Sequence, residues 1–388
     1  MKVQAAALKT TSGDQKLKFP KKKWNHSSNA DPEEVKHLCD EWDMHPLVAG
    51  ILLDRGFKTQ EDIKSFLRPS LNDLRDPFQL RHMQQAVELI QDAIVNSRHI
   101  IILGDYDVDG ITATTLVLDF LNACGAEKAD YFIPNRLKHG YGLTEASTDI
   151  LLERNADLVI TVDNGITAAG EIQRLNDAGI KTIVTDHHLA ETDLLPPGIV
   201  INPNHPECKY PFKKISGCGV ALKLVMALRK LLRTLGWWTS ARPEPNLRNS
   251  LDLAALGTVA DVVPLLDENR IITYHGLKVM NDKPRLAIQV LKHLKKVKTI
   301  TSSTLAFQFG PLMNAAGRLK DADLAVRFLL SNDRQEAEKM AQILDATNAE
   351  RREKESEMIQ TALKLADEQK DNPALILVSP EFHEGVNG

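Results

Sequence analysis

The chain has 388 residues, enough for two or more domains with substantial apolar cores. Its composition, 43% hydrophobic and 26% charged, is that of an ordinary globular protein, and a net charge of −4 does not by itself indicate a nucleic-acid-binding protein. No apolar run is long enough to span a membrane, and the polar N-terminus lacks the apolar core of a signal peptide. The four cysteines form no C-x-x-C pair, which predicts free thiols and a cytoplasmic protein.

Helices are predicted first and an alternation of strands and helices after them. Residues 1–30 are polar, and residues 31–95 are expected to form short helices. From residue 98 onward, apolar β-rich segments alternate with helical ones, which predicts an α/β fold with a doubly wound, mainly parallel sheet. The predicted strands are 98–104, 129–133, 158–162, 182–185 and 199–201, and the helices between them include 111–123 and 167–178.

The second half is predicted to be mainly helical. An amphipathic helix is expected at 220–235, a surface loop at 238–249 and further helices over 250–330. Asp333 and Glu336 have capping-box spacing, which predicts the start of a long helix that ends near residue 368.

The predicted domain organisation follows from these elements. Residues 374–378 are apolar and predict a strand, after which the sequence stops within ten residues. A lone strand cannot form a domain. The expected division is an N-terminal helical region (1–95), a domain that contains the sheet (96–330), a connector helix (333–369) and the truncated start of a second domain (370–388).

Three acids alternate where the first predicted strand ends. Residues 104–110 read Gly-Asp-Tyr-Asp-Val-Asp-Gly and contain Asp105, Asp107 and Asp109. Carboxylates this close repel one another, and they stay ionised only when cations or water lie between them. The triplet therefore indicates a metal site. Taken alone, it is also compatible with a solvated acidic turn that caps the following helix.

The same residues resemble the start of an EF-hand calcium loop. That loop requires a bidentate Glu at its twelfth position, where this chain has Leu116. It also requires a preceding helix, whereas the sequence here predicts a strand. An EF-hand is therefore excluded.

Two more predicted strands end in possible metal ligands. Asp163 follows the strand at 158–162, and Asp186, His187 and His188 follow the next one. Because the carboxyl ends of parallel strands meet at one edge of the sheet, these side chains are expected to share a crevice. Asp and His without thiolates fit Mn²⁺ or Mg²⁺ better than a Cys-rich zinc site. So many ligands predict two ions, which lie about 3.5–4 Å apart in two-metal phosphoester hydrolases.

These strand ends resemble the DHH phosphoesterase superfamily. The matching segments are 104–110, 162–165 (Val-Asp-Asn-Gly) and 185–188 (Thr-Asp-His-His). Further segments resemble one branch of it, the bacterial exonucleases that degrade single-stranded DNA from 5′ to 3′. They are 131–136 (Tyr-Phe-Ile-Pro-Asn-Arg), 140–142 (Gly-Tyr-Gly), 217–220 (Gly-Cys-Gly-Val), 255–264 (Ala-Leu-Gly-Thr-Val-Ala-Asp-Val-Val-Pro) and 314–318 (Asn-Ala-Ala-Gly-Arg).

The resemblance implies roles for individual residues. The implied metal ligands are Asp105, Asp107, Asp109, Asp163, His187, His188 and Asp261, with Asp105 in the inner or an outer shell and His188 as a ligand or a transition-state contact. The same set without Asp105 is the implied catalytic group. Arg136, Asn314 and Arg318 would bind the substrate, the two arginines through charge-assisted hydrogen bonds to the 5′-terminal phosphate. The family usually has an Arg at the position of Leu312, so one cationic contact is missing here.

The resemblance also implies cofactors and partners. They are two divalent ions, Mn²⁺ or Mg²⁺, a single-stranded DNA with a 5′ end, and a role in DNA repair and recombination. Single-strand-binding protein and helicases are candidate protein partners, and no membrane is expected. Family members continue into a second core domain, which would begin where this sequence stops at Gly388, and then into an oligonucleotide-binding domain.

Two other functions stay open at this point. One is a DHH hydrolase of small substrates such as short oligonucleotides, cyclic dinucleotides or pyrophosphate, and cleavage of a long strand compared with that of a dinucleotide would separate them. The other is an inactive fragment or scaffold, which metal titration beside an activity assay would reveal.

Overall fold

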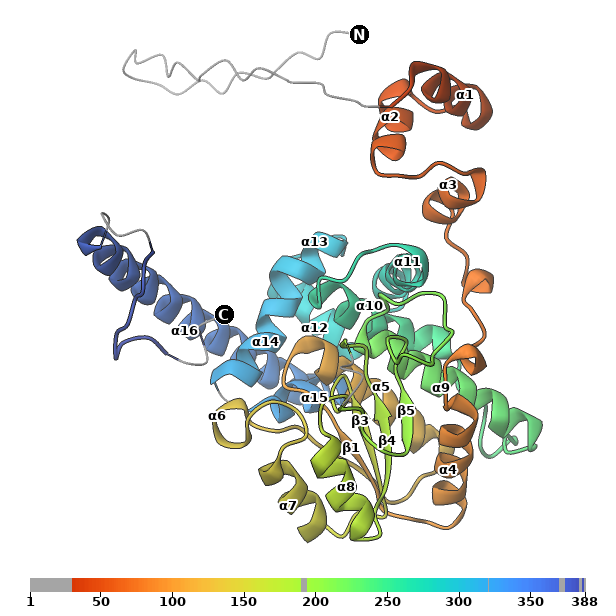
Figure 1. Ribbon diagram of the computed structural model, residues 1–388, viewed down its shortest axis with the longest axis vertical. Helices are drawn as coiled ribbons and strands as arrows, with labels where there is room; N and C mark the ends of the chain where they lie inside the picture. The colour runs from red at the N-terminus through yellow and green to blue at the C-terminus, as the bar shows by residue number, and fades with distance from the viewer. Residues whose placement is uncertain (1–29, 190–193, 320, 370–373, 384–385, 387–388) are drawn as a thin grey trace. The chain divides into compact units, whose positions relative to one another are not determined.

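The computed structural model describes residues 30–189, 194–319, 321–369, 374–383 and 386 (Figure 1). The chain divides into two compact units, residues 1–64 and 65–388. In the described part of the first unit, α1 (Pro32–Trp42) begins where the Asp31 side chain accepts a hydrogen bond from the Glu33 backbone N–H. The other helices here are α2 (Pro46–Asp54) and the start of α3 (Gln60–Leu67). Across the described residues, no helix combines the length and apolarity that crossing a membrane requires.

The second unit contains a parallel sheet whose strands are ordered β2-β1-β3-β4-β5. The strands are β1 (Ile100–Leu103), β2 (Ala129–Phe132), β3 (Leu158–Val162), β4 (Lys181–Thr185) and β5 (Ile199–Ile201), and every pairing is parallel. The predicted α/β class with a doubly wound parallel sheet is confirmed. Since the strand order reverses between β1 and β3, the crevice beyond their carboxyl ends is where such folds bind ligands.

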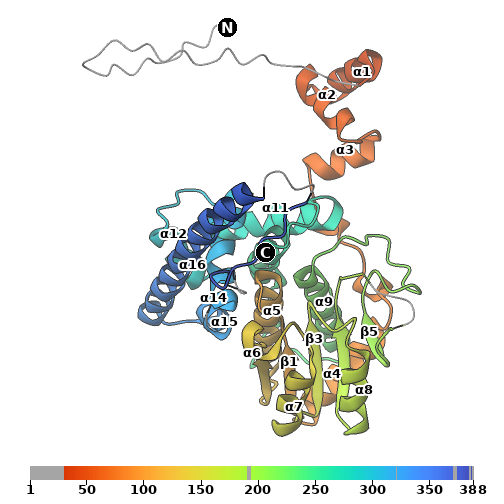
Figure 2. The same ribbon diagram turned by 60° about the vertical axis from the view of Figure 1, so that its left-hand side comes forward.

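Helices cover both faces of this sheet, and strand residues alternate between them. Ile100 and Ile102 of β1 join a core with α4 (Met83–Val95), α5 (Val108–Cys124) and α9 (Gly217–Thr234). Ile101 and Leu103 join a separate core with α7 (Glu145–Glu153) and α8 (Ala169–Asp177). Figures 1 and 2 show these two helical layers on opposite sides of the strands. Because alternate residues of a strand such as β1 are buried against opposite helical layers, the strand appears in the sequence as a continuous apolar run.

The remaining elements of the second unit are mainly helical. They are η1 (Leu71–Asp73), η2 (Pro77–Gln79), α6 (Arg136–His139), η3 (Leu247–Ser250), α10 (Leu251–Ala260), α11 (Asp267–Asp282), α12 (Leu286–Leu294), α13 (Ser302–Thr304), η4 (Leu305–Phe309), α14 (Gly310–Leu319), α15 (Asp323–Leu330) and α16 (Arg334–Glu368). The η4 segment is a π-helical turn that ends two residues before Pro311, which has no N–H for the α-helical ladder. The wider turn carries the helix past this proline and on into α14.

The long helix α16 begins as predicted. The Asp333 side chain accepts a hydrogen bond from the Glu336 N–H at 2.8 Å. Its buried apolar stripe consists of Ala337, Met340, Ala341 and Leu344. No residue of α16 beyond Asn348 is buried, so only the first part of this helix packs into the core.

The predicted strand at 374–378 is wrong. These residues pair with none of the strands in the described part of the chain, and the side chains of Ile376 and Val378 are 76% and 79% exposed. The Gln369 side chain instead bonds both the N–H and the carbonyl of Ile376. A strand needs a neighbour for its backbone groups, and the apolar composition that suggested one cannot supply it. The wider domain division stays a prediction, although α4, at the end of the predicted N-terminal region, packs into the core of the sheet.

Candidate metal centre

The acid triplet lies between the end of β1 and the start of α5. Asp107 is the N-cap of α5 and accepts a hydrogen bond from the Gly110 N–H at 3.0 Å. The helix begins at Val108, three residues before the predicted start, so Asp109 lies in its first turn. The turn is therefore a helix cap, as the alternative interpretation expected, but two of its three acids are not solvated, because Asp105 and Asp109 are each only 1% exposed.

A second helix start holds Asp109 in place. Its two carboxylate oxygens accept hydrogen bonds from the N–H groups of Gly217, at 2.6 Å, and Cys218, at 3.0 Å, in the first turn of α9. The unpaired N–H groups and the dipole of a helix N-terminus favour a negative charge there. A Cβ atom on Gly217 would lie 2.6 Å from Cγ of Asp163, so only glycine lets α9 come this close.

The ends of β3 and β4 bring the other predicted ligands to the same edge. Asp163 turns the chain in the left-handed region, at φ 63°, where Asp is among the better tolerated residues. The buried Asp186 accepts hydrogen bonds from the backbone N–H of His187 at 2.7 Å and of His188 at 3.1 Å. It also bonds Nδ1 of His188 at 2.7 Å and the Ile166 N–H at 3.0 Å. Asp186 therefore orients both histidines rather than facing the cluster itself.

These residues converge around His187. Its Nε2 lies 3.2 Å from Oδ1 of Asp163, 3.7 Å from Oδ2 of Asp261 and 4.0 Å from Oδ2 of Asp109. Asp261, at the end of α10, had no strand-end signal in the sequence and was implied by the family resemblance alone. Three groups have ligand atoms that all lie within 4.8 Å of one another. They are Asp109–His187–Asp261, Asp105–Asp107–Asp163 and Asp163–His187–His188.

Several of these atoms are buried without any hydrogen-bond partner. They are Oδ1 of Asp105, Oδ1 of Asp163, Nε2 of His187 and Oδ2 of Asp261. Buried polar atoms are almost always paired, so four unpaired ones in one cluster require an explanation. Divalent cations supply it, because carboxylate oxygens and an imidazole nitrogen are ligands that Mn²⁺ and Mg²⁺ accept. The residues present therefore fit a site for divalent metal ions.

The same part of the chain matches a family pattern. The pattern described as "DHH family, N-terminal domain" matches residues 99–258, which include the ends of β1, β3 and β4. A crystal structure described as exonuclease RecJ bound to manganese is 34% identical, with a TM-score of 0.71, over 82% of this chain and 77% of its own. The chain belongs to the DHH family. Within it, the similarity to RecJ proteins extends over most of the chain.

Two other RecJ proteins show how far this similarity reaches. The single-stranded-DNA-specific exonuclease RecJ of Bacillus subtilis is 38% identical over 361 residues, 92% of this chain and 44% of the relative. The structure of RecJ in complex with Mn²⁺ from Thermus thermophilus matches with a TM-score of 0.76 and 33% identity, over 93% of this chain and 50% of the other. The chain thus spans about half the length of these DHH-family relatives.

Burial gives the acids of this DHH-family site unusual pKa values. Desolvation, followed by the charge of Asp107, raises the pKa of Asp105 to about 8 and that of Asp261 to about 7. Burial and neighbouring carboxylates also raise the pKa of Asp109 and Asp163 well above the ordinary value. Without cations the protein therefore keeps protons on this cluster near neutral pH.

The two histidines are affected in opposite directions. Burial, together with the charge of His188, lowers the pKa of His187 to about 4, so its imidazole is neutral and suited to bind a metal ion. The hydrogen bond to Asp186 raises the pKa of His188 to about 9. His188 thus carries a positive charge near neutral pH in the protein without metal.

This cluster predicts a pH-dependent stability that metal reverses. The pKa of Asp105 rises from 3.8 unfolded to about 8 folded, so the folded protein binds more protons than the unfolded one. Its stabilising contribution is complete below about pH 4 and is lost as the pH rises to about 8. In EDTA, the loss of this contribution should lower the melting temperature of the protein as the pH rises from about 4 to about 8. Mn²⁺ should raise the melting temperature most at the alkaline end of that range. Thermal unfolding with EDTA and with Mn²⁺ at each pH tests this, and an equal gain from Mn²⁺ at every pH contradicts it.

The predicted substrate residues lie around Tyr106, within the acid motif. The guanidinium carbon of Arg136 is 5.6 Å from the centroid of the Tyr106 ring. Burial, together with the positive charges of Arg351 and Arg136, lowers the pKa of Arg318, while Glu355, which pairs with Arg351 at 2.7 Å, acts in the opposite direction. Arg351, on α16, belongs to no motif that the sequence offered. A cluster of cations beside the metal centre fits an anionic ligand.

Asn314 and Leu312 have structural contacts on α14. Oδ1 of Asn314 accepts a hydrogen bond from the Val108 N–H at 3.0 Å and so ties α14 to the start of α5. Leu312 is fully buried in the main core. At the position where the family resemblance implies an arginine, this chain therefore has a packing residue.

Tyr141 is a site residue that was not singled out from the sequence. Its ring is 48% exposed and meets both Tyr106 and His188 edge-on, with centroids 6.0 Å and 6.3 Å apart. The Gly-Tyr-Gly segment at 140–142 was the available signal, and it was used only to support the resemblance. Tyr141 thus forms an aromatic wall next to His188.

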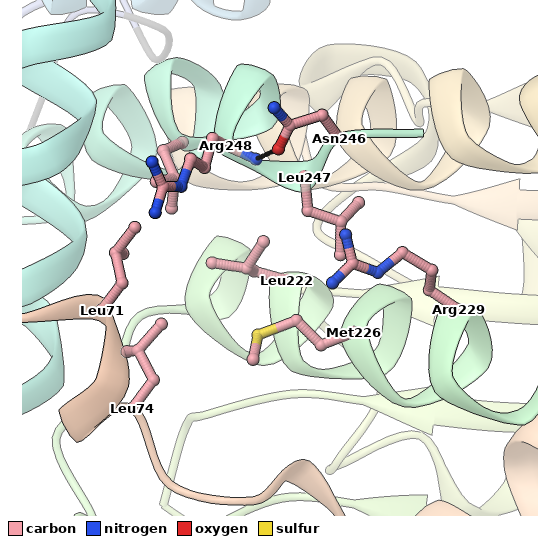
Figure 3. A pocket seen from close by; sticks show the side chains of 9 residues that line it. Leu71, Leu74, Leu222, Met226, Arg229, Asn246, Leu247 and Arg248 are labelled. Carbon is pink, nitrogen blue, oxygen red and sulfur yellow. Dashed lines mark hydrogen bonds between the residues drawn. The ribbon is translucent and has the colours of Figure 1, made fainter. Parts of the chain in front are cut away.

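The metal centre is separate from the cavity in Figure 3. That cavity, of about 220 Å³, is lined by Leu71, Leu74, Leu222, Met226, Arg229, Asn246, Leu247, Arg248 and Leu251. This lining includes no acidic side chain and none of the predicted site residues, so the cavity is not the catalytic crevice.

Proposed function

We propose that this chain is the metal-dependent catalytic part of a phosphodiesterase that removes nucleotides from the 5′ end of single-stranded DNA. The observation that carries the proposal is the set of four buried, unpaired ligand atoms at the carboxyl edge of the sheet. The names of the relatives support the substrate, since they are single-stranded-DNA-specific exonucleases. The relatives described as bound to Mn²⁺ and Mg²⁺ support the choice of metal.

The proposed ligand sets follow the geometric groups. Asp109, His187 and Asp261 would hold one divalent ion, and Asp105, Asp107 and Asp163 the other. When bound, two such ions lower the pKa of water and stabilise charge on phosphoryl oxygens.

The protein's own charged side chains would complete this centre. His188, charged and oriented by Asp186, would donate a hydrogen bond to the scissile phosphate as negative charge develops on it. Arg136 and Arg318 would bind the 5′-terminal phosphate. Asn314 would hold the acid segment 104–110 in place through its hydrogen bond with the Val108 N–H.

The biological setting is a further part of this proposal. Cys39, Cys124, Cys208 and Cys218 are free thiols, which suits a reducing cytoplasm. A role in DNA repair and recombination, with single-strand-binding protein and helicases as partners, is proposed from the relatives' names and the family resemblance. We also propose that 96–330 is the catalytic domain and 333–369 the connector to a further domain.

A polarity assay tests the proposal. The chain is incubated with Mn²⁺ and a 5′-phosphorylated single strand labelled at either end. Release from the 5′ end gives labelled mononucleotide at once from the 5′-labelled strand and a descending ladder from the 3′-labelled strand. Initial release from the 3′ end, or no release by a chain with Mn²⁺ bound, overturns the proposal. Faster turnover of a dinucleotide than of the long strand would instead identify a small-substrate hydrolase.

The proposed phosphate site predicts a selective effect of Arg136→Gln. Losing a charge-assisted contact should raise KM for 5′-phosphorylated strands about 10- to 100-fold, since such bonds contribute roughly 1.5–3 kcal/mol. KM for strands with a 5′-hydroxyl should not change. Arg154→Gln is the matched control, because Arg154 also lies over an aromatic ring, that of Phe132, at 5.1 Å. An equal rise in KM for both kinds of strand would place Arg136 outside the phosphate site.

A further inference from the structure

Two asparagines beyond β5 hold the backbone of both histidines. β4 and β5 pair up to Thr185 and Ile201, where the sheet ends. Past that point, Nδ2 of Asn204 donates to the His187 carbonyl at 2.6 Å, and Nδ2 of Asn202 donates to the His188 carbonyl at 2.9 Å. The side-chain amides thus continue the β4–β5 contact beyond the point where backbone pairing stops.

The asparagines are themselves fixed in position. Oδ1 of Asn202 accepts a hydrogen bond from the Asn204 N–H at 2.7 Å, which joins the two into one unit. Nζ of Lys213 donates to the carbonyl of Pro203, between them, at 2.6 Å. Asn202 is fully buried, and Asn204 is partly exposed. This unit therefore has little freedom to move.

We infer that Asn202 and Asn204 are positioning residues that set the metal affinity of the centre. The His187 backbone is held at its N–H by Asp186 and at its carbonyl by Asn204, at a position from which Nε2 of the ring lies 3.2 Å from Oδ1 of Asp163. His188 is held in the same way by Asp186 and Asn202. Groups that orient metal ligands typically change metal affinity by about 10–100-fold when they are lost. The inference rests on the proposed metal centre and adds residues that contact neither metal nor substrate.

Substitution by aspartate removes the donor while keeping the shape. In N202D and N204D, a carboxylate oxygen would face the histidine carbonyl oxygen, and the two acceptors would repel each other. Asn281→Asp is the matched control, because Nδ2 of Asn281, on α11, donates in the same way to the carbonyl of Ile300, at 2.9 Å. It tests the general cost of this substitution without touching a histidine.

Calorimetric titration of the metal-free chain with Mn²⁺ is the deciding measurement. We expect the dissociation constant to rise about 10–100-fold in N204D and N202D and to stay unchanged in N281D, with melting temperatures in EDTA lowered to a similar degree in all three. If N202D does not fold, N204D and Asn204→Ser carry the test, since position 204 is partly exposed. Wild-type affinity in folded N204D, or an equal loss in N281D, overturns the inference. A wild-type chain that binds no Mn²⁺ overturns the proposed metal centre instead.

Discussion

Replacing Asp163 by asparagine is expected to lower Mn²⁺-dependent nucleotide release by about 10⁴-fold, because metal ions supply several kcal/mol of transition-state stabilisation and each 1.36 kcal/mol is tenfold in rate. Asp163 belongs to two of the three ligand groups, and its Oδ1 lies closest to Nε2 of His187. A neutral amide cannot supply the negative charge with which a carboxylate would hold a divalent ion. The loss should therefore exceed that of Asp261→Asn, since Asp261 belongs to one group only.

The same substitution should not destabilise the protein without metal. The carboxyl of Asp163 is buried, and its pKa is raised well above the ordinary value, so ionising it in the folded state is unfavourable. A neutral amide avoids that cost. In EDTA at alkaline pH, D163N should melt at the wild-type temperature or above it. Asp149→Asn, at an exposed acid paired with Arg174, is the control for both measurements. Full activity in D163N, or a lower melting temperature in EDTA, would contradict this role.

Most of the sheet could be predicted because β1, β3, β4 and β5 are largely buried on both faces. β3 and β5 coincide with the predicted 158–162 and 199–201, and the other strands differ by one or two residues at their ends. The starts of α5 and α9 were placed three residues too late. The first turn of each helix contains polar or small residues of the site, Asp109 in α5 and Gly217 in α9, and a search for apolar periodicity does not detect such residues. The helix starts were therefore missed where they bind the acid cluster.

The candidate site was predictable where ligands follow strands and not where they follow helices. The sequence indicated Asp163 and His187 because each lies at the end of an apolar run. Asp261 follows a helix, and nothing local distinguishes it from a C-terminal cap. Asn202 and Asn204 also follow a strand, but an Asn-Pro-Asn segment normally indicates a turn. Only the three-dimensional contacts with the histidine carbonyls reveal what these amides do.

Gly217→Ala is expected to lower the rate of nucleotide release about as much as removing a contact to the substrate would. A Cβ atom there would lie 2.6 Å from Cγ and 2.7 Å from Cβ of Asp163, so the Asp163 side chain must move. The Gly217 N–H also donates to Asp109, so both carboxylates are disturbed together. A displacement on the order of 1 Å can cost about 100-fold in rate. Overpacking should further lower the free energy of unfolding by about 1–3 kcal/mol.

Gly170→Ala separates this steric effect from the general effect of adding a methyl group. Gly170 also lies in the first turn of a helix, α8, but a Cβ atom there would meet nothing within 4 Å. Since alanine favours helix by about 1 kcal/mol over glycine, G170A should unfold at the same or a slightly higher urea concentration, with unchanged activity and Mn²⁺ affinity. G217A should lose both activity and affinity at temperatures where it remains folded. If G217A binds Mn²⁺ as wild type does, α9 can move away without cost, and Asp109 and Asp163 do not depend on its close approach.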